Sequence, residues 1–220
     1  LGVMGFPMAG HLAKEGYNVT VYNRSEEKSK LWIKNHIGTY STSIKEAVSD
    51  SDIVFSCVGN DTDLREITLG TDKAFSSMKP GSVFIDHTTT SSDIAVELSK
   101  KAKELNIHFL DAPVSGGEVG AVKGELTVMI GGENSIFEKT KSIIAAYAKN
   151  ITLIGGSGKG QIAKMVNQIC IAGLIQALSE AISFSEKSGL DTKKVLDAIS
   201  QGAAGSWQLT NRGETMVDRK

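Results

Sequence analysis

The sequence is short of the features that would define a protein class at once. Its 220 residues include only 2 cysteines, Cys57 and Cys170, which lie far apart and predict no disulfide framework. This usage is typical of a reducing cytoplasm, where we expect the protein to act. The 4 histidines show no HxxxH spacing and no CxxC motif occurs, so no protein-bound metal is expected.

Membrane and nucleic-acid binding also find little support. No apolar run reaches the length of about 18 residues that a membrane span needs, and no signal peptide precedes the first motif. The formal net charge of −1 provides no basic surface for nucleic acid or for a membrane. The hydrophobic share of 40% and the charged share of 22% are ordinary for a globular protein. At this length the chain can form one large domain, or one domain with part of a second.

Short apolar segments alternate with amphipathic helical segments through most of the chain. The apolar segments are rich in β-branched residues and are bounded by Gly, Asp or Pro, which is typical of strands. Their alternation with helices predicts an α/β fold with a mostly parallel sheet and helices on both faces. The expected strands are 17–23, 52–58, 82–88, 107–113, 125–132 and 150–155, and the expected helices are 5–15, 25–35, 43–50, 61–78, 91–105 and 134–148.

The pattern changes near Gly160, where the strands stop. Residues 161–188 predict one long helix, and shorter helices are expected over 191–199 and from Ser206. We therefore expect an α/β domain over residues 1–158 and an all-α domain over residues 159–220, which begins with a long interdomain helix.

The first residues resemble part of a nucleotide-binding motif. In LGVMGFPMAG, Gly2 and Gly5 immediately precede a helical pattern. A dinucleotide fingerprint places three glycines between a strand and a helix, and the helix N-terminus then binds the pyrophosphate. The second and third glycines are present, so we expect a Rossmann-like sheet whose first strand precedes Leu1 and a chain truncated at this end. Taken alone, the pair also fits an ordinary helix start.

The end of the second expected strand indicates which dinucleotide would bind. An acidic residue there would recognise the ribose 2′-hydroxyl of NAD, and an arginine would accommodate the 2′-phosphate of NADP. The sequence has Asn23, Arg24 and Ser25 at this place. A guanidinium beside a hydroxyl and an amide suits a phosphate, which favours NADP over NAD. Alternatively, Arg24 is a solvated surface charge and Ser25 caps the next helix.

A second, glycine-rich motif reads DAPVSGGEVGAVKGELTVMIGG over residues 111–132. Ser115, Gly116 and Gly117 follow an expected strand and offer a hydroxyl and successive backbone N–H groups, which can form a small nest for an anion. A glycine-rich turn without chemical importance would look the same, and this loop alone does not separate the two.

Four motifs together resemble one family. GxxGxPMAxxL, NRS, DAPVSGGxxGAxxGxLxxMxGG and GxGxxxKMxNQ occur in the order and spacing of the β-hydroxyacid dehydrogenases. Members include 3-hydroxyisobutyrate dehydrogenase, 2-hydroxy-3-oxopropionate reductase and the glyoxylate/succinic semialdehyde reductases, with 6-phosphogluconate dehydrogenase more distant. The resemblance covers essentially the whole chain. It implies an NAD(P)-dependent oxidoreductase that acts on a small β-hydroxy acid or semialdehyde, with 3-hydroxyisobutyrate and glycerate as leading candidates.

The resemblance also implies a role for individual residues. The implied cofactor-binding residues are Gly2, Val3, Met4, Gly5, Asn23, Arg24, Ser25, Val58, Gly59 and Thr89. The implied substrate-binding residues are Ser115, Gly116, Gly117, Asn167 and Gln168, and the implied catalytic residue is Lys164.

Lys164 lies inside one of the most apolar helical patterns of the chain. Lysine is rarely buried without a partner, because its ammonium loses hydration. Residues three and four apart share a helix face, so a polar stripe is expected over Gln161, Lys164, Asn167 and Gln168. A solvated stripe would look similar. The residues on the other faces are Ile162, Met165, Val166, Ile169 and Cys170, and their apolar character predicts that most of this turn is buried, as in the floor of a cleft.

The resemblance implies hydride transfer in which Lys164 donates or accepts the proton, and burial would lower its pKa toward a useful range. Non-catalytic nucleotide-sensing relatives and imine reductases lack a lysine there, so Lys164 disfavours both. A fragment that binds nothing is a third alternative. Family members continue through further helices, so truncation is also expected after VDRK, and the full-length protein is expected to be a homodimer or homotetramer. Trp207, Asn211 and Arg212 are candidates for substrate selection, although Trp207 fits interdomain packing equally well.

Overall fold

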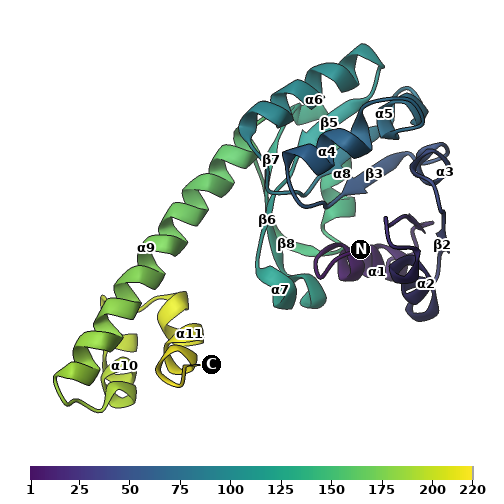
Figure 1. The fold of residues 1–220 in the computed structure, drawn as a ribbon. Helices are drawn as coiled ribbons and strands as arrows, with labels where there is room; N and C mark the ends of the chain where they lie inside the picture. Colours follow the sequence, from purple (N-terminus) through teal and green to yellow (C-terminus); the bar gives the residue numbers. More distant parts are fainter. Residues whose placement is uncertain (220) are drawn as a thin grey trace. The chain divides into compact units, whose positions relative to one another are not determined.

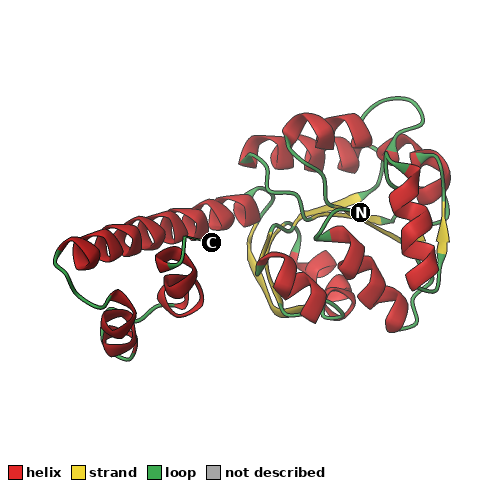
Figure 2. Cartoon of the chain, turned by 60° about the horizontal axis from the view of Figure 1, so that its bottom comes forward, coloured by secondary structure: helices red, strands yellow, loops and turns green. Residues whose placement is uncertain are grey.

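The computed structural model describes residues 1–219, which fold as two compact units, Leu1–Lys164 and Met165–Lys220 (Figures 1 and 2). The first unit contains all the strands of the described residues, and the second is helical. Helix α9 (Lys159–Lys187) begins in the first unit and continues into the second. The expected domain division at 158–159 lies close to the start of this helix and stays a prediction.

A six-stranded mixed sheet forms the centre of the first unit, in the order β3-β4-β5-β7-β6 with β8 on the other side of β7. Neighbouring strands are parallel from β3 to β5 and between β7 and β8, whereas β5 and β6 both pair antiparallel with β7. A separate parallel pair joins β1 and β2. The bounds are β1 Thr20–Val21, β2 Thr39–Tyr40, β3 Ile53–Ser56, β4 Val83–Asp86, β5 His108–Asp111, β6 Val114–Ser115, β7 Leu126–Gly131 and β8 Ala148–Gly155.

Helices cover both faces of this sheet (Figure 2). Strand β4 shows how the pleat divides the core: Val83 and Ile85 belong to one buried cluster, and Phe84 between them belongs to the other. Side chains of α1, α7 and α8 fill the first cluster, and side chains of α3 to α6 fill the second. The bounds are α1 Gly5–Lys14, α2 Glu26–Asn35, α3 Ile44–Val48, α4 Asp61–Thr68, α5 Ala74–Ser77, α6 Ser92–Glu104, α7 Gly117–Lys123 and α8 Asn134–Ile144.

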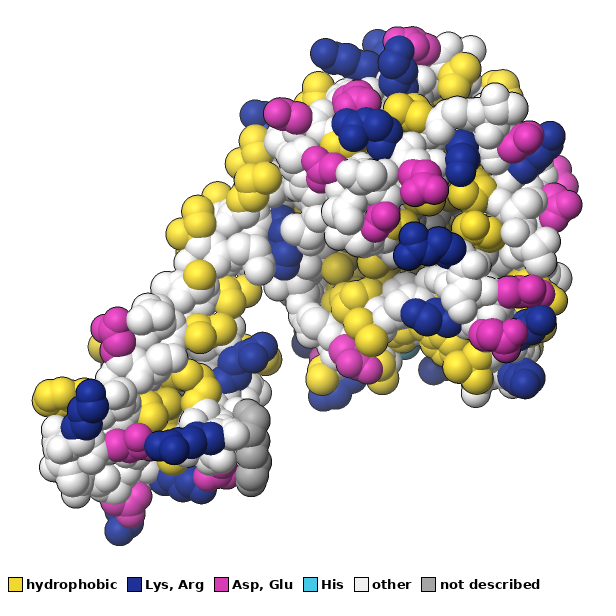
Figure 3. Space-filling view, viewed as in Figure 1, with side chains coloured by type: hydrophobic (Ala, Val, Ile, Leu, Met, Phe, Trp, Pro, Cys, Tyr) yellow, Lys and Arg dark blue, Asp and Glu magenta, His cyan; other side chains and the backbone are white. Residues whose placement is uncertain are grey.

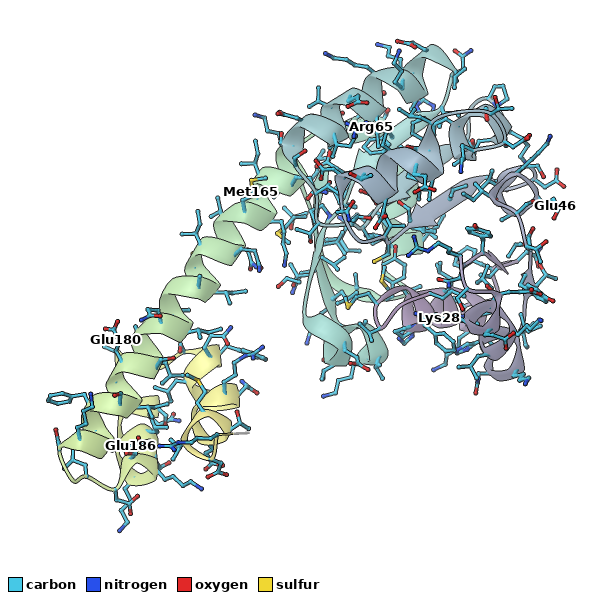
Figure 4. The ribbon with its side chains drawn as sticks, in the orientation of Figure 1. Lys28, Glu46, Arg65, Met165, Glu180 and Glu186 are labelled. Carbon is cyan, nitrogen blue, oxygen red and sulfur yellow. The ribbon has the colours of Figure 1, made fainter. Side chains whose placement is uncertain are left out.

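Polar side chains fix the starts of the helices on the second face. Asn60 and Ser91 cap α4 and α6 by accepting a backbone N–H. Arg65 of α4, labelled in Figure 4, donates from Nη2 to Glu97 Oε2 of α6 over 2.6 Å, and Asp61 at the start of α4 accepts from Ser91 N–H. The loops after β3 and β4 are therefore tied together where these two helices begin.

The predicted α/β fold with a mostly parallel sheet, followed by helices, is confirmed. Three short elements were not expected, namely β2, β6 and α7, and the helix expected over 61–78 is divided into α4 and α5. Gly70, with φ 109°, lies between α4 and α5 in a backbone conformation that ends a helix. Strands of two residues, such as β2 and β6, carry too little alternation to be recognised.

The second unit contains the rest of α9 with α10 (Thr192–Ser200) and α11 (Trp207–Val217). The predicted caps are present, since Asp191 accepts from Lys194 N–H and Ser206 accepts from Leu209 N–H. A small core joins the three helices, and its buried residues are Leu178, Ile182, Leu196 and Leu209. A buried hydrogen bond between Ser185 and Thr192 (2.9 Å) links α9 to α10.

Much of the apolar surface of α9 is exposed, as Figure 3 shows along the helix. Ile162 is 40% exposed, Met165 43%, Val166 56% and Ile169 73%, and Cys170 is also exposed. The expectation that these neighbours of Lys164 are buried is therefore wrong for this structure. By length and composition α9 also meets the criterion for a membrane span, with a mean hydropathy of 1.4. One such helix is a weak indication, and the expected absence of a span stays a prediction.

Candidate cofactor and active site

Helix α1 begins at Gly5, directly after the expected glycine motif. Its N-cap residue, Met4, provides no side-chain hydrogen bond, and the first turn contains no acidic residue. Phe6 N–H donates to Gly2 O over 3.0 Å and Pro7 has no N–H, so the backbone N–H groups before Phe6 and the positive end of the helix dipole are left for an anion. Gly2 and Val3 are exposed just before this start, which is the arrangement that a pyrophosphate requires.

The residues expected around the adenosine ribose follow β1. Asn23 donates from Nδ2 to Ser25 O over 3.0 Å, which holds the turn after β1. Arg24 is exposed and has no carboxylate partner among the described residues. Ser25 is the N-cap residue of α2 but makes no side-chain capping bond, so the capping role proposed as its alternative function is absent here.

The carboxyl ends of β3 and β4 are joined by a hydrogen bond between the next two segments. Val58 N–H donates to Thr88 Oγ1 over 3.0 Å. Gly59 follows directly, and a Cβ at this position would lie 2.5 Å from Asp63 Oδ2. Thr89 is exposed while Thr88 and Thr90 on either side are buried. The predicted residues Val58, Gly59 and Thr89 therefore lie together at one edge of the parallel sheet, where ligands bind in folds of this kind.

Asp86, the last residue of β4, is buried and accepts hydrogen bonds from the segments that form this edge. Its Oδ1 accepts from Ser56 Oγ (2.6 Å), Thr88 Oγ1 (2.6 Å) and Thr88 N–H (3.1 Å). Its Oδ2 is buried without a hydrogen-bond partner in residues 1–219. Burial raises the pKa of Asp86 to about 7, against the opposing effect of the hydrogen bonds from Ser56 and Thr88.

His87 is also buried, and its ring joins two strands. Nδ1 lies 2.7 Å from Ala112 O and Nε2 lies 2.8 Å from the hydroxyl of Tyr147. A carbonyl oxygen only accepts, so Nδ1 carries the proton and Nε2 accepts from Tyr147. Phe55 stacks on the ring at a centroid distance of 5.8 Å. Burial lowers the pKa of His87 to about 4, so the ring is neutral near pH 7.

Helix α9 starts against the buried carboxylate of Asp111, at the end of β5. Asp111 Oδ1 accepts from Gly158 N–H (2.7 Å) and Oδ2 accepts from Gln161 N–H (3.0 Å). This carboxylate, on a strand distant in sequence, therefore caps the start of α9, and its negative charge interacts favourably with the positive end of the helix dipole. Gly160 is required here, because a Cβ would lie 2.4 Å from Met129 O and 2.8 Å from Asp111 O.

Lys164 lies in the second turn of α9 and is 9% exposed. No hydrogen bond or ion pair of its ammonium occurs within the described part of the chain, and burial lowers its pKa. Gln161, one turn earlier, is 1% exposed. The predicted polar stripe is therefore buried at Gln161 and Lys164 and becomes more exposed at Asn167 and Gln168, which bond to each other over 2.9 Å.

The expected anion nest coincides with the start of α7. Ser115 ends β6, Gly116 has φ 133° and Gly117 has φ 61°, which are conformations that L side chains rarely adopt. Gly116 is the N-cap residue of α7, so successive N–H groups follow the Ser115 hydroxyl. The motif leads directly into a helix, and its two alternatives, an anion nest and a glycine-rich turn without chemical importance, both stay predictions.

The roles of Asp86, Asp111 and His87, which support this edge of the sheet, were not predicted from the sequence. Asp86 and Asp111 each end an apolar strand, in VFID and HFLD, and a charged residue directly after a buried run was the available signal. For His87 and Tyr147, which are 60 residues apart, the sequence offers no pairing signal. None of the described residues form a cluster of three or more metal-ligand side chains, while the expected absence of a metal stays a prediction.

The donor groups at this edge fit a dinucleotide. The N-terminus of α1 is free of acidic and capping side chains, Arg24 is unpaired in residues 1–219, and Gly59 permits a close approach. A parallel sheet with such a carboxyl edge defines the first unit as a Rossmann-like dinucleotide-binding domain.

Comparison with known proteins identifies the family. Residues 1–155 match the NAD binding domain of 6-phosphogluconate dehydrogenase, and residues 158–220 match the NAD-binding region of NADP-dependent 3-hydroxyisobutyrate dehydrogenase. The chain is 51% identical over 216 residues to an uncharacterized oxidoreductase of Shewanella frigidimarina, which covers 98% of this chain and 74% of that protein. It is 36% identical over 220 residues to the 2-hydroxy-3-oxopropionate reductase of Escherichia coli, which covers 100% of this chain and 74% of that protein.

A solved structure of a protein from this family also resembles the chain. The 3-hydroxyisobutyrate dehydrogenase of Mycobacterium tuberculosis, solved with L-serine, matches with a TM-score of 0.87 at 29% identity over 96% of this chain and 71% of that chain. The chain therefore belongs to the 3-hydroxyisobutyrate dehydrogenase family of NAD(P)-dependent oxidoreductases, the β-hydroxyacid dehydrogenases.

Proposed function

We propose that the protein transfers a hydride between NADP and a small β-hydroxy acid or its semialdehyde, with Lys164 as the proton donor and acceptor. The single observation that carries this proposal is the burial of Lys164, which is 9% exposed without a carboxylate partner among the described residues. A lysine kept from water for structural reasons would be paired. An unpaired one is suited to proton transfer, because burial lowers its pKa and the ammonium gives up its proton more readily.

The nicotinamide ring of the bound dinucleotide supplies or accepts the hydride at its C4 atom. In the reducing direction, the carbonyl carbon of a semialdehyde gains the hydride while the Lys164 ammonium donates a proton from Nζ to the carbonyl oxygen. In the oxidising direction, the neutral Lys164 amine takes the proton from the substrate hydroxyl. Burial lowers the pKa of Lys164, which makes its ammonium a better proton donor than that of a solvated lysine.

The substrate carboxylate is assigned to Ser115, Gly116 and Gly117. Backbone N–H groups at the start of α7 and the Ser115 hydroxyl suit a carboxylate. The positive φ of Gly116 and Gly117 favours glycine, so no side chain at these two positions blocks a ligand from the backbone. Asn167 and Gln168 are proposed to orient the substrate beside Lys164. Support for the substrate class comes from the relatives, one of which is a 2-hydroxy-3-oxopropionate reductase and another a 3-hydroxyisobutyrate dehydrogenase.

The preference for NADP rests on Arg24. Its guanidinium is exposed, while the neighbouring carboxylate of Glu26 lies 3.2 Å from Lys30 Nζ and accepts from the Tyr40 hydroxyl. The carboxylate of Glu26, two residues after Arg24, is thus already partnered. A planar guanidinium binds phosphate through two hydrogen bonds, and NAD offers only a hydroxyl at the same place.

The proposal is tested by measuring turnover of the full-length protein with NADPH and NADH against 2-hydroxy-3-oxopropionate, methylmalonate semialdehyde, succinic semialdehyde and glyoxylate. We expect reduction of one member of this panel, faster with NADPH, and its loss in Lys164→Met. Lys187→Met, at the exposed end of the same helix, is the control and should keep full activity. Turnover that survives Lys164→Met would contradict the role of the lysine, and cofactor binding without turnover would indicate a sensing role.

A further inference from the structure

We propose that Gln161 is a positioning residue that fixes the loop after β4 relative to Lys164 by clamping the backbone on both sides of Thr89. The inference rests on the function proposed above, because it concerns the alignment of the same lysine and the same cofactor-binding loop. It assigns a role to a side chain that makes no contact with the reacting atoms and acts only through what it holds.

The clamp consists of two hydrogen bonds from one amide group. Gln161 Nε2 donates to Thr88 O over 2.7 Å, and Gln161 Oε1 accepts from Thr90 N–H over 3.0 Å. These backbone groups flank Thr89, and the amide pairs with them as a neighbouring strand would. A primary amide is the neutral side chain that offers a donor and an acceptor side by side. The side chain is 1% exposed, so water does not compete for either bond.

The backbone of Gln161 is itself attached to the sheet. Its N–H donates to Asp111 Oδ2 over 3.0 Å, and Gly158 N–H donates to Oδ1 of the same carboxylate over 2.7 Å. Gly160 lies so close to Met129 O and Asp111 O that no side chain would fit. The first turn of α9 is therefore fixed to β5, and the Gln161 side chain extends this attachment to the loop after β4.

Lys164 lies three residues later on the same face of the helix and is also buried, at 9% exposure. Both residues belong to the first compact unit. Because one continuous helical turn joins them, the position of the Lys164 backbone relative to Thr89 depends on the clamp. Losing the clamp would leave Thr88 O and Thr90 N–H buried and unpaired, which favours a rearrangement of the loop. Alignment of reacting groups is sensitive to shifts of about 1 Å.

The test compares Gln161→Met, which keeps the length of the side chain and removes both hydrogen bonds, with the unaltered protein. We expect kcat to fall about 10- to 100-fold and the Kd for NADPH to rise by a smaller factor, because Thr89 is only one of the residues expected to bind the cofactor. The pKa of Lys164, measured from the pH dependence of acetic anhydride labelling with mass spectrometry, is expected to rise toward its ordinary value, because a loosened turn admits water. Gln176→Met is the matched control, because Gln176 lies on an exposed part of α9 and its amide donates to Glu180 Oε1 of the same helix over 2.8 Å.

Gln161→Glu provides a second and independent readout. The ionised carboxylate can accept from Thr90 N–H, but it has no proton to donate to Thr88 O. Protonation restores the donor, so the ratio of its kcat to that of the unaltered protein should increase as the pH falls. A residue that only filled space would give a ratio independent of pH.

Unchanged kcat and unchanged Lys164 pKa in Gln161→Met would overturn the inference, as would a pH-independent ratio for Gln161→Glu. If Gln161→Met does not fold, Gln161→Asn, which keeps the amide on a side chain one methylene shorter, takes its place in the same measurements. Failure of the proposed function is a different result, in which Lys164→Met keeps its turnover. The labelling pKa of Lys164 decides the inference even then, since it needs neither substrate nor turnover.

Discussion

Asp86 and His87 are consecutive residues at the end of β4, and burial drives their pKa values in opposite directions. Asp86 is 1% exposed and His87 is 2% exposed. The pKa of Asp86 rises to about 7, and that of His87 falls to about 4. Both groups are thus neutral over much of the range between these values, and they hold the loops after β3, β4 and β5 without a buried charge.

This opposition predicts how stability depends on pH. The folded state binds more protons at Asp86 than the unfolded chain between about pH 4 and 7, so this contribution is complete below pH 4 and is lost as the pH rises through 7. For His87 the unfolded chain binds more protons between about pH 4 and 6.5, so stability is lost as the pH falls through this range. Over most of the window the two effects cancel.

Replacing one of the two residues should therefore reveal how the other changes the free energy of unfolding with pH. We expect the free energy of unfolding of Asp86→Asn to fall by about 3 kcal/mol as the pH falls from 7 to 4, because only the His87 contribution remains, whereas that of the unaltered protein changes little over most of this range. His87→Gln should show the reverse, a fall of about 4 kcal/mol as the pH rises over the same range. Urea titrations at several pH values measure both, and parallel pH profiles for all three proteins would contradict the assignment.

The burial of Lys164 predicts the pH dependence of the reaction. Its pKa is lowered from the ordinary value of 10.5, so the ammonium is lost at a lower pH than for a solvated lysine. Reduction requires the ammonium, and kcat should therefore fall as the pH rises through this pKa. Oxidation requires the amine, and kcat should rise over the same interval. Profiles of log kcat against pH in both directions should cross with a shared midpoint, and two unrelated midpoints would exclude one group acting in both roles.

Arg24 should decide between the two dinucleotides. Arg24→Ala is expected to raise KM for NADPH by about 10- to 100-fold, the loss of about 1.5–3 kcal/mol in charge-assisted hydrogen bonds, and to leave KM for NADH nearly unchanged. The control is Lys34→Ala, which removes an exposed charge from the last turn of α2. Steady-state kinetics with both cofactors measures the effect, and equal changes for NADPH and NADH would mean that Arg24 does not recognise the 2′-phosphate.

Two glycines of α9 should respond oppositely to alanine. A Cβ at Gly160 would meet Met129 O at 2.4 Å and Asp111 O at 2.8 Å, so Gly160→Ala should destabilise the first unit by about 1–3 kcal/mol. At Gly173 nothing lies within 4 Å, and Gly173→Ala should be neutral or stabilising by up to about 1 kcal/mol. Thermal unfolding of the two variants distinguishes them, and equal shifts would show that the start of α9 is not packed against β5 as described.

Local patterns in the sequence determined the helices and strands, and they also contain the motifs by which the family is recognised. The alternation of apolar strands with capped helices specifies the α/β fold, since period and capping are properties of neighbouring residues. Gly2 and Gly5 were recognised by the spacing of a dinucleotide fingerprint before a helix. Gly116 and Gly117 were recognised as part of a glycine-rich motif, and both adopt the positive φ that favours glycine. Lys164 was predicted to be buried because its neighbours on the other helix faces are apolar, and although Lys164 is buried, those neighbours are exposed.

The support of that site was decided only by tertiary structure. The contacts of Asp111 with Gly158, of Gln161 with Thr88 and of His87 with Tyr147 join residues at least 47 positions apart, and local pattern says nothing about such pairs. The apolar neighbours of Lys164 illustrate the same limit. Periodicity shows that α9 has an apolar side, but these hydrogen bonds turn the polar side of its first turns toward the sheet. Which face is buried depends on long-range pairing, and that is fixed when the chain folds.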